Sequence, residues 1–285
     1  MNPAHQKGQA LLADIAQTRA AGSSRIWWLG QSGFLVVTPA ATILFDPYLS
    51  DSLTKKYANT DKPHTRVTEQ VIDPGLLTDI DLITSSHNHT DHLDAETLLP
   101  LFSSNPHAKL VIPRANREFV LGRLGPVDDR LIDIDAGEAL THGPIEITGI
   151  PAAHNSVERD EHGQCKFLGF VAKIGGLTCY HSGDTLLHDG LIPAIAPFEP
   201  DIAFVPINGN KPERRVAGNL DGREAAEVAK AIGAKLAIPH HFDMFAFNTA
   251  TPDLFTTECQ RVGQAFKVLK NGEGIDLAKR SDGSV

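Results

Sequence analysis

The sequence predicts an α/β protein in which two β-sheets pack face to face and helices cover the outside. Short apolar runs separated by Gly and Pro indicate a meander of strands near the start of the chain. Later strands alternate with helices in both halves, which fits a layered sandwich. The 285 residues are 41% hydrophobic and can bury a full core. No interior linker, charge block or repeat divides the chain, so we expect one domain, 1–285.

The first half is expected to open with a helix and then form short strands. Residues 9–21 indicate a polar-faced helix in which Asp14 and Arg19 interrupt any apolar run. Residues 51–79 are polar, contain Pro and show little periodicity, so we expect a long loop over a functional site. The elements expected in this half are helices 9–21, 94–101 and 117–123 and strands 25–29, 33–38, 42–45, 80–84 and 109–112.

The second half is expected to alternate between strands and helices, with apolar runs supplying the strands. The elements expected are strands between 131 and 173, helix 186–195, strand 202–205, helix 222–232, strand 236–238 and helix 254–262.

The run from His87 to His92 has the pattern H-x-H-x-D-H and contains three imidazoles and one carboxylate. His87 and His89 are two positions apart, so they point the same way in an extended segment. Asp91 and His92 can face a second position if the chain turns into a helix. The alternative is a polar loop that happens to be rich in His. Imidazole with carboxylate suits zinc, manganese or iron better than calcium, so the pattern predicts one or two transition-metal ions.

Further metal-ligand side chains follow three apolar runs downstream. They are His154 after 145–150, His181 and Asp184 after 177–180, and His240 and His241 after 234–238. A single His after a strand is usually a surface residue, but four such positions in chain order, counting the opening run, are hard to explain that way. Because open sheets present their sites at strand ends, we expect these side chains to meet.

These motifs resemble the metallo-β-lactamase superfamily, and within it the branch that includes the L-ascorbate-6-phosphate lactonases. The superfamily resemblance rests on the H-x-H-x-D-H run, the later His, the Gly-Asp pair and the final His. The branch resemblance covers about residues 26–277 and rests on segments 28–34, 46–52, 180–185, 206–209 and 241–245. The resemblance implies an αββα four-layer sandwich of the metallo-β-lactamase type.

The resemblance also implies roles for individual residues. The implied ligands are His87, His89 and His154 for a first metal, Asp91, His92 and His241 for a second, and Asp184 as a bridge. His241 is favoured over its neighbour His240 because the family's ligand directly precedes the aromatic residue. His181, Asn208 and Asn219 resemble positions near the active-site rim, and a packing role is the alternative for His181.

The implied activity is metal-dependent hydrolysis of a small anionic ester, lactone or sugar-phosphate lactone. One or two divalent ions, zinc or manganese, would hold a hydroxide and polarise the scissile carbonyl or phosphoryl oxygen. Asp91 is expected to orient the attacking water and pass a proton to the leaving group. Arg214 and Arg215, with His181 and Asn208, are expected to contact the substrate, because an Arg fork can hold a phosphate or carboxylate. A solvated loop is the alternative for the two arginines.

Two other functions stay open: a phosphodiesterase or nuclease, which would share the ligand set, and a non-catalytic metal-binding protein, which a complete ligand set disfavours. The net charge of −9 argues against a general nucleic-acid binder and favours a small-molecule substrate.

The three cysteines form no C-x-x-C pair and indicate neither a disulfide framework nor a thiolate metal site. Without a signal-peptide pattern or an apolar run near the ~20 residues of a membrane span, we expect a cytoplasmic protein with no membrane partner. A homo-oligomer stays open.

Overall fold

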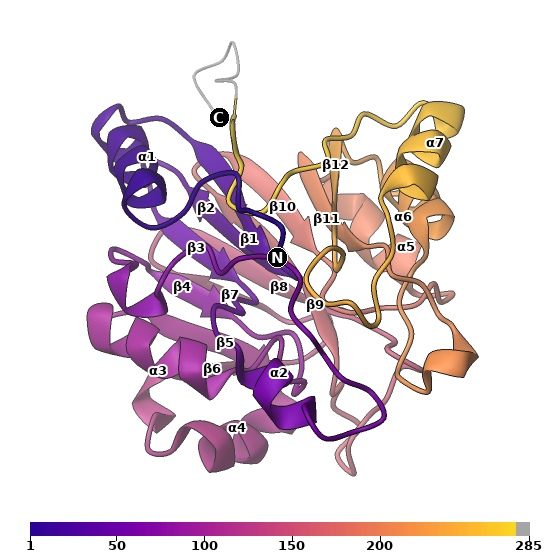
Figure 1. Ribbon diagram of the computed structural model, residues 1–285, viewed down its shortest axis with the longest axis horizontal. Helices are drawn as coiled ribbons and strands as arrows, with labels where there is room; N and C mark the ends of the chain where they lie inside the picture. Colours follow the sequence, from indigo (N-terminus) through magenta and orange to yellow (C-terminus); the bar gives the residue numbers. More distant parts are fainter. Residues whose placement is uncertain (278–285) are drawn as a thin grey trace.

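The computed structural model describes residues 1–277, which form two mixed β-sheets stacked face to face (Figure 1). The first sheet has the strand order β13-β1-β2-β3-β4-β5-β6 and the second has the order β12-β11-β10-β9-β8-β7. The first sheet contains β1 (Arg25–Gly30), β2 (Gly33–Val37), β3 (Thr42–Phe45), β4 (Leu82–Thr84), β5 (Lys109–Pro113), β6 (Leu131–Ile134) and β13 (Gly274–Asp276). The second contains β7 (Ala139–His142), β8 (Ile145–Pro151), β9 (Leu168–Ile174), β10 (Leu177–His181), β11 (Ile202–Pro206) and β12 (Leu236–His240).

Helices cover the outer face of each sheet (Figure 1). The helices are α1 (Gln9–Ala20), α2 (Ser52–Tyr57), α3 (Ala95–Ser104), α4 (Arg117–Leu124), α5 (Leu191–Ile195), α6 (Gly222–Ala231) and α7 (Asp253–Val262). Helices α1, α3 and α4 pack on the first sheet, whereas α5, α6 and α7 pack on the second. The layers therefore follow the predicted order αββα. Each helix among residues 1–277 is too short or too polar to cross a membrane.

Alternating side chains of β1 show how one strand serves two cores. Ile26 and Trp28 belong to the cluster between the sheets, whereas Trp27 and Leu29 belong to the cluster under α1, α3 and α4. Successive strand residues point to opposite faces, so a strand buried on both sides must be apolar throughout. Between the sheets, Phe34 of β2 stacks on Phe204 of β11 with ring centroids 4.0 Å apart.

Three local predictions differ from the structure. Residues 51–79 were expected to be irregular but include α2, whose six residues bury only Leu53 and are too few to show a helical period. The edge strand β13 was not predicted, since its three residues are only partly buried or exposed. The predicted helix 186–195 is shortened to Leu191–Ile195, because Leu186 bonds to the backbone of Ala153 instead of continuing a helix. Residues 278–285 of the predicted domain lie outside the described residues.

The stacked pair Phe34 and Phe204 gives a test of the two-sheet core. Phe34→Ala should lower the free energy of unfolding by about 3–5 kcal/mol, because the cavity it leaves lies between two sheets. Phe119→Ala is the matched control, since Phe119 is 46% exposed, and it should cost less than about 1 kcal/mol. Chemical denaturation followed by circular dichroism measures both; similar losses for the two variants would contradict the assigned packing.

Candidate metal centre

The ends of four strands bring all seven predicted ligands together. Strand β4 leads into the run 87–92, and strands β8, β10 and β12 lead to His154, Asp184 and His241 respectively. Nitrogen atoms of His87, His89 and His154 all lie within 4.8 Å of one another. Ligand atoms of Asp91, His92 and His241 form a second such group, and His87, His92 and Asp184 form a third.

Asp184 lies between the two halves of this cluster. One carboxylate oxygen is 3.4 Å from His92 Nε2. The other is 3.5 Å from His154 Nε2 and 3.3 Å from His241 Nε2. A carboxylate in this position could serve ions held by either group of donors, and a bridge remains the role that the resemblance implies for Asp184.

The donor atoms fit a bound transition metal. Within the described residues, His87 Nε2, His92 Nε2 and Asp184 Oδ1 are buried and make no hydrogen bond. A buried polar atom without a partner costs about 1–3 kcal/mol, so native proteins rarely leave several of them in one place. Imidazole nitrogen and carboxylate oxygen are ligands for zinc, manganese or iron, and such an ion would satisfy all three atoms.

Groups behind the cluster orient the imidazoles toward it. His92 Nδ1 lies 2.7 Å from Asp46 Oδ2, His87 Nδ1 lies 3.0 Å from Ser86 Oγ, and His154 Nδ1 donates to the carbonyl of Gly218 at 2.8 Å. Each contact leaves Nε2 to face the cluster, as in metal sites whose histidines are held through the second nitrogen.

Asp46 also accepts hydrogen bonds from Thr84 Oγ1 and the Ser86 backbone N–H. Burial raises the pKa of Asp46, but His181 and the hydrogen-bonded His92 outweigh it and lower the pKa to about 2. Asp46 is therefore ionised and suited to hold the Nδ1 proton of His92.

The electrostatics differ between the two halves of the cluster. Burial lowers the pKa of His87 and His154, so both imidazoles are neutral and ready to act as ligands. Burial also acts to lower the pKa of His92 and His241, but the nearby carboxylates of Asp184 and Asp91 outweigh it and raise both values. Metal binding at that half would displace protons.

Comparison with known proteins agrees with this geometry. Residues 41–242 match the family model described as Beta-lactamase superfamily domain. A UPF0173 metal-dependent hydrolase of Opitutus terrae is 31% identical over 258 residues, which cover 89% of this chain and all of the relative. The chain belongs to the metallo-β-lactamase superfamily. A second UPF0173 relative, from Myxococcus xanthus, is 26% identical and covers 97% of this chain and 90% of its own length.

Solved structures share the fold. The metallo hydrolase Igni18 of Ignicoccus hospitalis superposes with a TM-score of 0.66 at 21% identity, over 90% of this chain and 100% of that one. An isothiocyanate hydrolase from Delia radicum gut bacteria gives 0.69 at 15% identity, over 88% of this chain and 98% of that one.

Gln31 is a site residue that the sequence analysis missed. Its Nε2 donates to Asp91 Oδ2 at 2.8 Å and lies 3.1 Å from His241 Nε2. Gln31 is 3% exposed and sits between β1 and β2 with a positive φ of 48°. A Gln is neither charged nor a usual metal ligand, so the residue type alone does not identify Gln31 as a site residue. The one indication in the sequence is its position within segment 28–34, which resembles the family.

His181 and His240 lie behind the cluster rather than in it. Both are fully buried and stack with ring centroids 5.2 Å apart. His181 Nε2 donates to the carbonyl of Ser32 at 2.7 Å, and its Nδ1 accepts from the Gly183 N–H at 3.1 Å. Because both ring nitrogens are occupied and the ring is sealed from solvent, the expected substrate contact of His181 is corrected to a packing role. His240 is held between Ser32 Oγ and Ser182 Oγ, at 3.2 Å from each.

Asn208 and Arg214 belong to a network that joins loops. Asn208 is 1% exposed and contacts Asn219 and Asn248 at 3.0 Å each. Arg214 donates to the carbonyls of Asn208 and Thr249 and to Asn248 Oδ1. Nη1 and Nη2 both donate to acceptors of the protein, and Asn208 is almost fully buried. These contacts favour a structural role for both residues over the expected substrate contact.

Arg215 is exposed and forms an ion pair with Asp61. Neither it nor Arg214, Asn208 or His181 lines the cavity above the cluster. The partners of these residues come from distant segments of the chain, so the sequence could not show that their polar groups were already in use.

A cavity of about 460 Å³ opens above the cluster. Its floor includes His89, Asp91, His154, Asp184 and His241. Segment 51–79, expected to cover a functional site, supplies part of the wall through Leu53, Lys56, Tyr57, Lys62 and His64. Helix α4 supplies Phe119 and Arg123, and the loop after β11 supplies Val216 and Ala217.

The two neighbouring histidines test the assignment of the last ligand. The parent chain is expected to bind between about one and two metal ions. His241→Ala should lower this number, because it removes a donor from the second half of the cluster. His240→Ala should keep the metal but unfold at lower temperature, since it leaves a buried cavity and removes the hydrogen-bond partner of Ser32 Oγ. Elemental analysis and thermal unfolding of both variants measure this. Full metal in His241→Ala with loss of metal in His240→Ala would reverse the assignment.

Proposed function

We propose that the chain is a metal-dependent hydrolase that acts on small anionic esters or lactones, including sugar-phosphate lactones. The observation that carries this proposal is the convergence of seven donor residues, four of which have a buried unpaired atom. Five of the seven line the floor of one cavity. A volume of about 460 Å³ lies in the range of small-molecule sites. The relatives named metal-dependent hydrolases support the reaction class.

Divalent ions held by the cluster would lower the pKa of a coordinated water and polarise the scissile carbonyl or phosphoryl oxygen. Asp91 is suited to orient that water and carry its proton, because its side chain is 14% exposed and lines the cavity. Burial raises the pKa of Asp91, but His92 and His241 lower it overall, so the carboxylate is ionised and can accept a proton. Gln31 holds one oxygen of this carboxylate and leaves the other for the proton transfer.

Direct attack by water is the route that the cavity supports. Among the described residues, its lining contains neither Ser nor Cys. All three cysteines are buried, and burial raises the pKa of each thiol, which opposes a nucleophilic thiolate.

Phosphodiester hydrolysis is the second candidate, favoured by the cations of the cavity wall, Lys56, Lys62 and Arg123. A screen of the metal-loaded protein against lactones, esters, thioesters and phosphodiesters separates the two. The expected result is turnover of an ester or lactone that a chelator abolishes and added zinc or manganese restores. Turnover confined to phosphodiesters would establish the second candidate, and metal binding without any turnover would indicate a non-catalytic protein.

Asp91→Asn tests the proton transfer. The change keeps the shape and one oxygen but removes the charge, so turnover should fall about 10²-fold or more while the first group of ligands still binds metal. Asp189→Asn is the matched control, because Asp189 is exposed and lies outside the cavity lining. Steady-state kinetics and metal content are measured for both variants. Near-normal turnover of Asp91→Asn on a substrate of the parent enzyme would remove Asp91 from the mechanism.

A further inference from the structure

The cavity above the metal cluster carries an excess of positive charge in a chain of net charge −9. Its wall includes Lys56, Lys62 and Arg123, and none of these forms an ion pair with a carboxylate of the described residues. The acidic residues of the lining are Asp91 and Asp184, which belong to the predicted metal ligands. The three cationic side chains are therefore free to interact with a bound anion.

The two lysines are positioned without being neutralised. Lys56 Nζ donates to Thr90 Oγ1 at 3.1 Å, and Lys62 Nζ donates to the backbone carbonyl of Arg215. Both acceptors are uncharged, so each ammonium group keeps its full charge. The ion pair between Arg215 and Asp61 ties the segment that carries Lys62 to the opposite loop.

Arg123 is fixed from the other side of the cavity. Its Nη1 donates to the carbonyls of Asn88 and Leu93 at 2.7 and 2.9 Å, and its guanidinium lies 4.5 Å from the ring centroid of Phe119. Within the described residues Nη2 makes no hydrogen bond and is not sealed off, so it can donate to a ligand.

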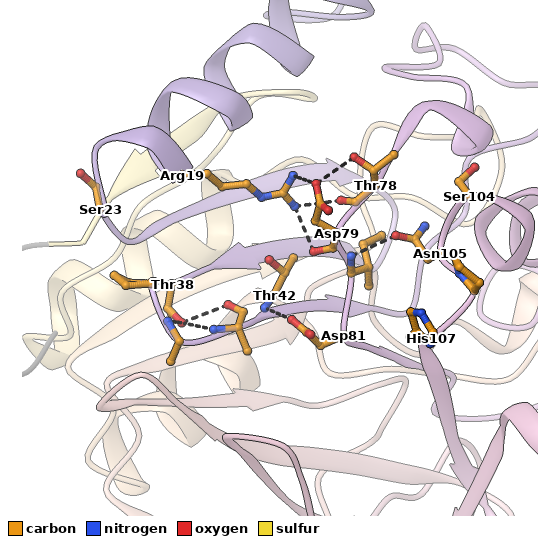
Figure 2. A pocket seen from close by; sticks show the side chains of 15 residues that line it. Arg19, Ser23, Thr38, Thr42, Thr78, Asp79, Asp81, Ser104, Asn105 and His107 are labelled. Atoms are coloured by element: carbon orange, nitrogen blue, oxygen red, sulfur yellow. Dashed lines mark hydrogen bonds and ion pairs between the residues drawn. The ribbon is translucent and has the colours of Figure 1, made fainter.

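A second hollow of the molecule has the opposite character. This hollow, of about 780 Å³, lies beside α1 and the turn between β2 and β3 (Figure 2). Figure 2 shows Arg19 directed at Asp79, with which it forms an ion pair at 3.2 Å. Asp81 accepts from the Thr42 backbone N–H at 2.8 Å. Arg19 and Asp81 are thus paired within the chain, so this hollow does not offer the unpaired cations that line the metal cavity.

We propose that Lys56, Lys62 and Arg123 form an anion subsite that binds a phosphate or carboxylate of the substrate at a distance from the bond that is cleaved. The inference deepens the proposed function and rests on it. Ionised donors bind such groups more strongly than neutral ones, and a site with one sign of charge concentrates ligands of the other sign. Leu53, Tyr57 and Phe119 add apolar surface for the body of the substrate. In this proposal Lys56, Lys62 and Arg123 take the anion-binding role that the sequence suggested for Arg214 and Arg215.

The test compares ligands that differ only in charge. The binding probes are N-phenylsuccinamate, the same amide with a phosphonate in place of the carboxylate, and N-phenylsuccinamide, in which a neutral primary amide replaces the carboxylate. Calorimetry with the metal-loaded full chain measures their affinities. A matched pair of aryl esters, 4-nitrophenyl hydrogen succinate and its methyl ester, gives KM and kcat.

The variant is Lys56→Ala with Lys62→Ala, and the control is Lys55→Ala with Lys173→Ala. Lys55 is next to Lys56 on α2 but pairs with Glu96, and Lys173 pairs with Glu146; neither lines the cavity. In the variant, affinity for at least one anionic amide should fall at least about tenfold, while the neutral amide changes less than about twofold. The control should leave every affinity within about twofold. A preference for carboxylate over phosphonate, or the reverse, identifies the group that the subsite takes.

Equal losses on charged and neutral amides, or no loss on either, would overturn the anion subsite. Failure of the proposed function gives a different pattern, because the amides test binding alone. Charge-dependent amide binding with no ester or lactone hydrolysed would retain the subsite and reject the hydrolase. Hydrolysis that is indifferent to substrate charge would retain the hydrolase and reject the subsite.

Discussion

The metal centre depends on the placement of one buried carboxylate among imidazoles. Asp184 is 3% exposed and has oxygens within 3.5 Å of His92, His154 and His241. Taking a carboxylate out of water is unfavourable unless opposite charges or hydrogen-bond donors compensate. Burial raises the pKa of Asp184, but the neighbouring imidazoles bring it well below its usual value. The folded chain therefore holds a buried negative charge where the two groups of donors meet, and such a charge favours the binding of cations.

The backbone around Asp184 is shaped by the same requirement. Gly183 has a φ of +57°, and a Cβ there would lie 2.6 Å from Ser86 Cβ and 2.8 Å from the carbonyl oxygen of Leu168. Only Gly permits both the left-handed conformation and this close approach. The contact brings the loop after β10 against the loop after β4, where Ser86 Oγ lies near Nδ1 of both His87 and His92. Two sheets contribute to one site because their loops can pack this tightly.

The positively charged residues in and around the cavity differ in their partners. Arg214 donates to loop carbonyls and Arg215 pairs with Asp61, so both hold loops together outside the cavity lining. Lys56 and Lys62 contact only uncharged acceptors and so remain available to a ligand. The distinction depends on their partners and not on residue type, since all four are lysines or arginines. An acidic molecule can in this way present a basic entrance to its metal site.

The sequence by itself determined the layer order, most of the strands and helices, and the identity of the residues that gather at the metal centre. Strand residues buried on both faces must be apolar, and strand ends must converge at a sheet edge, so both signals are local. Short elements such as α2 and β13 carry too few residues to show a period.

Only the tertiary structure decided which polar side chains face the cavity. Both ring nitrogens of His181 have partners within the protein, and one of these partners lies 149 residues away in the chain. Arg214 donates to three acceptors of the protein, whereas Lys56 and Arg123 line the cavity without a carboxylate partner among the described residues. Pairing between distant polar groups leaves no local pattern, because it depends on which loops the fold brings together.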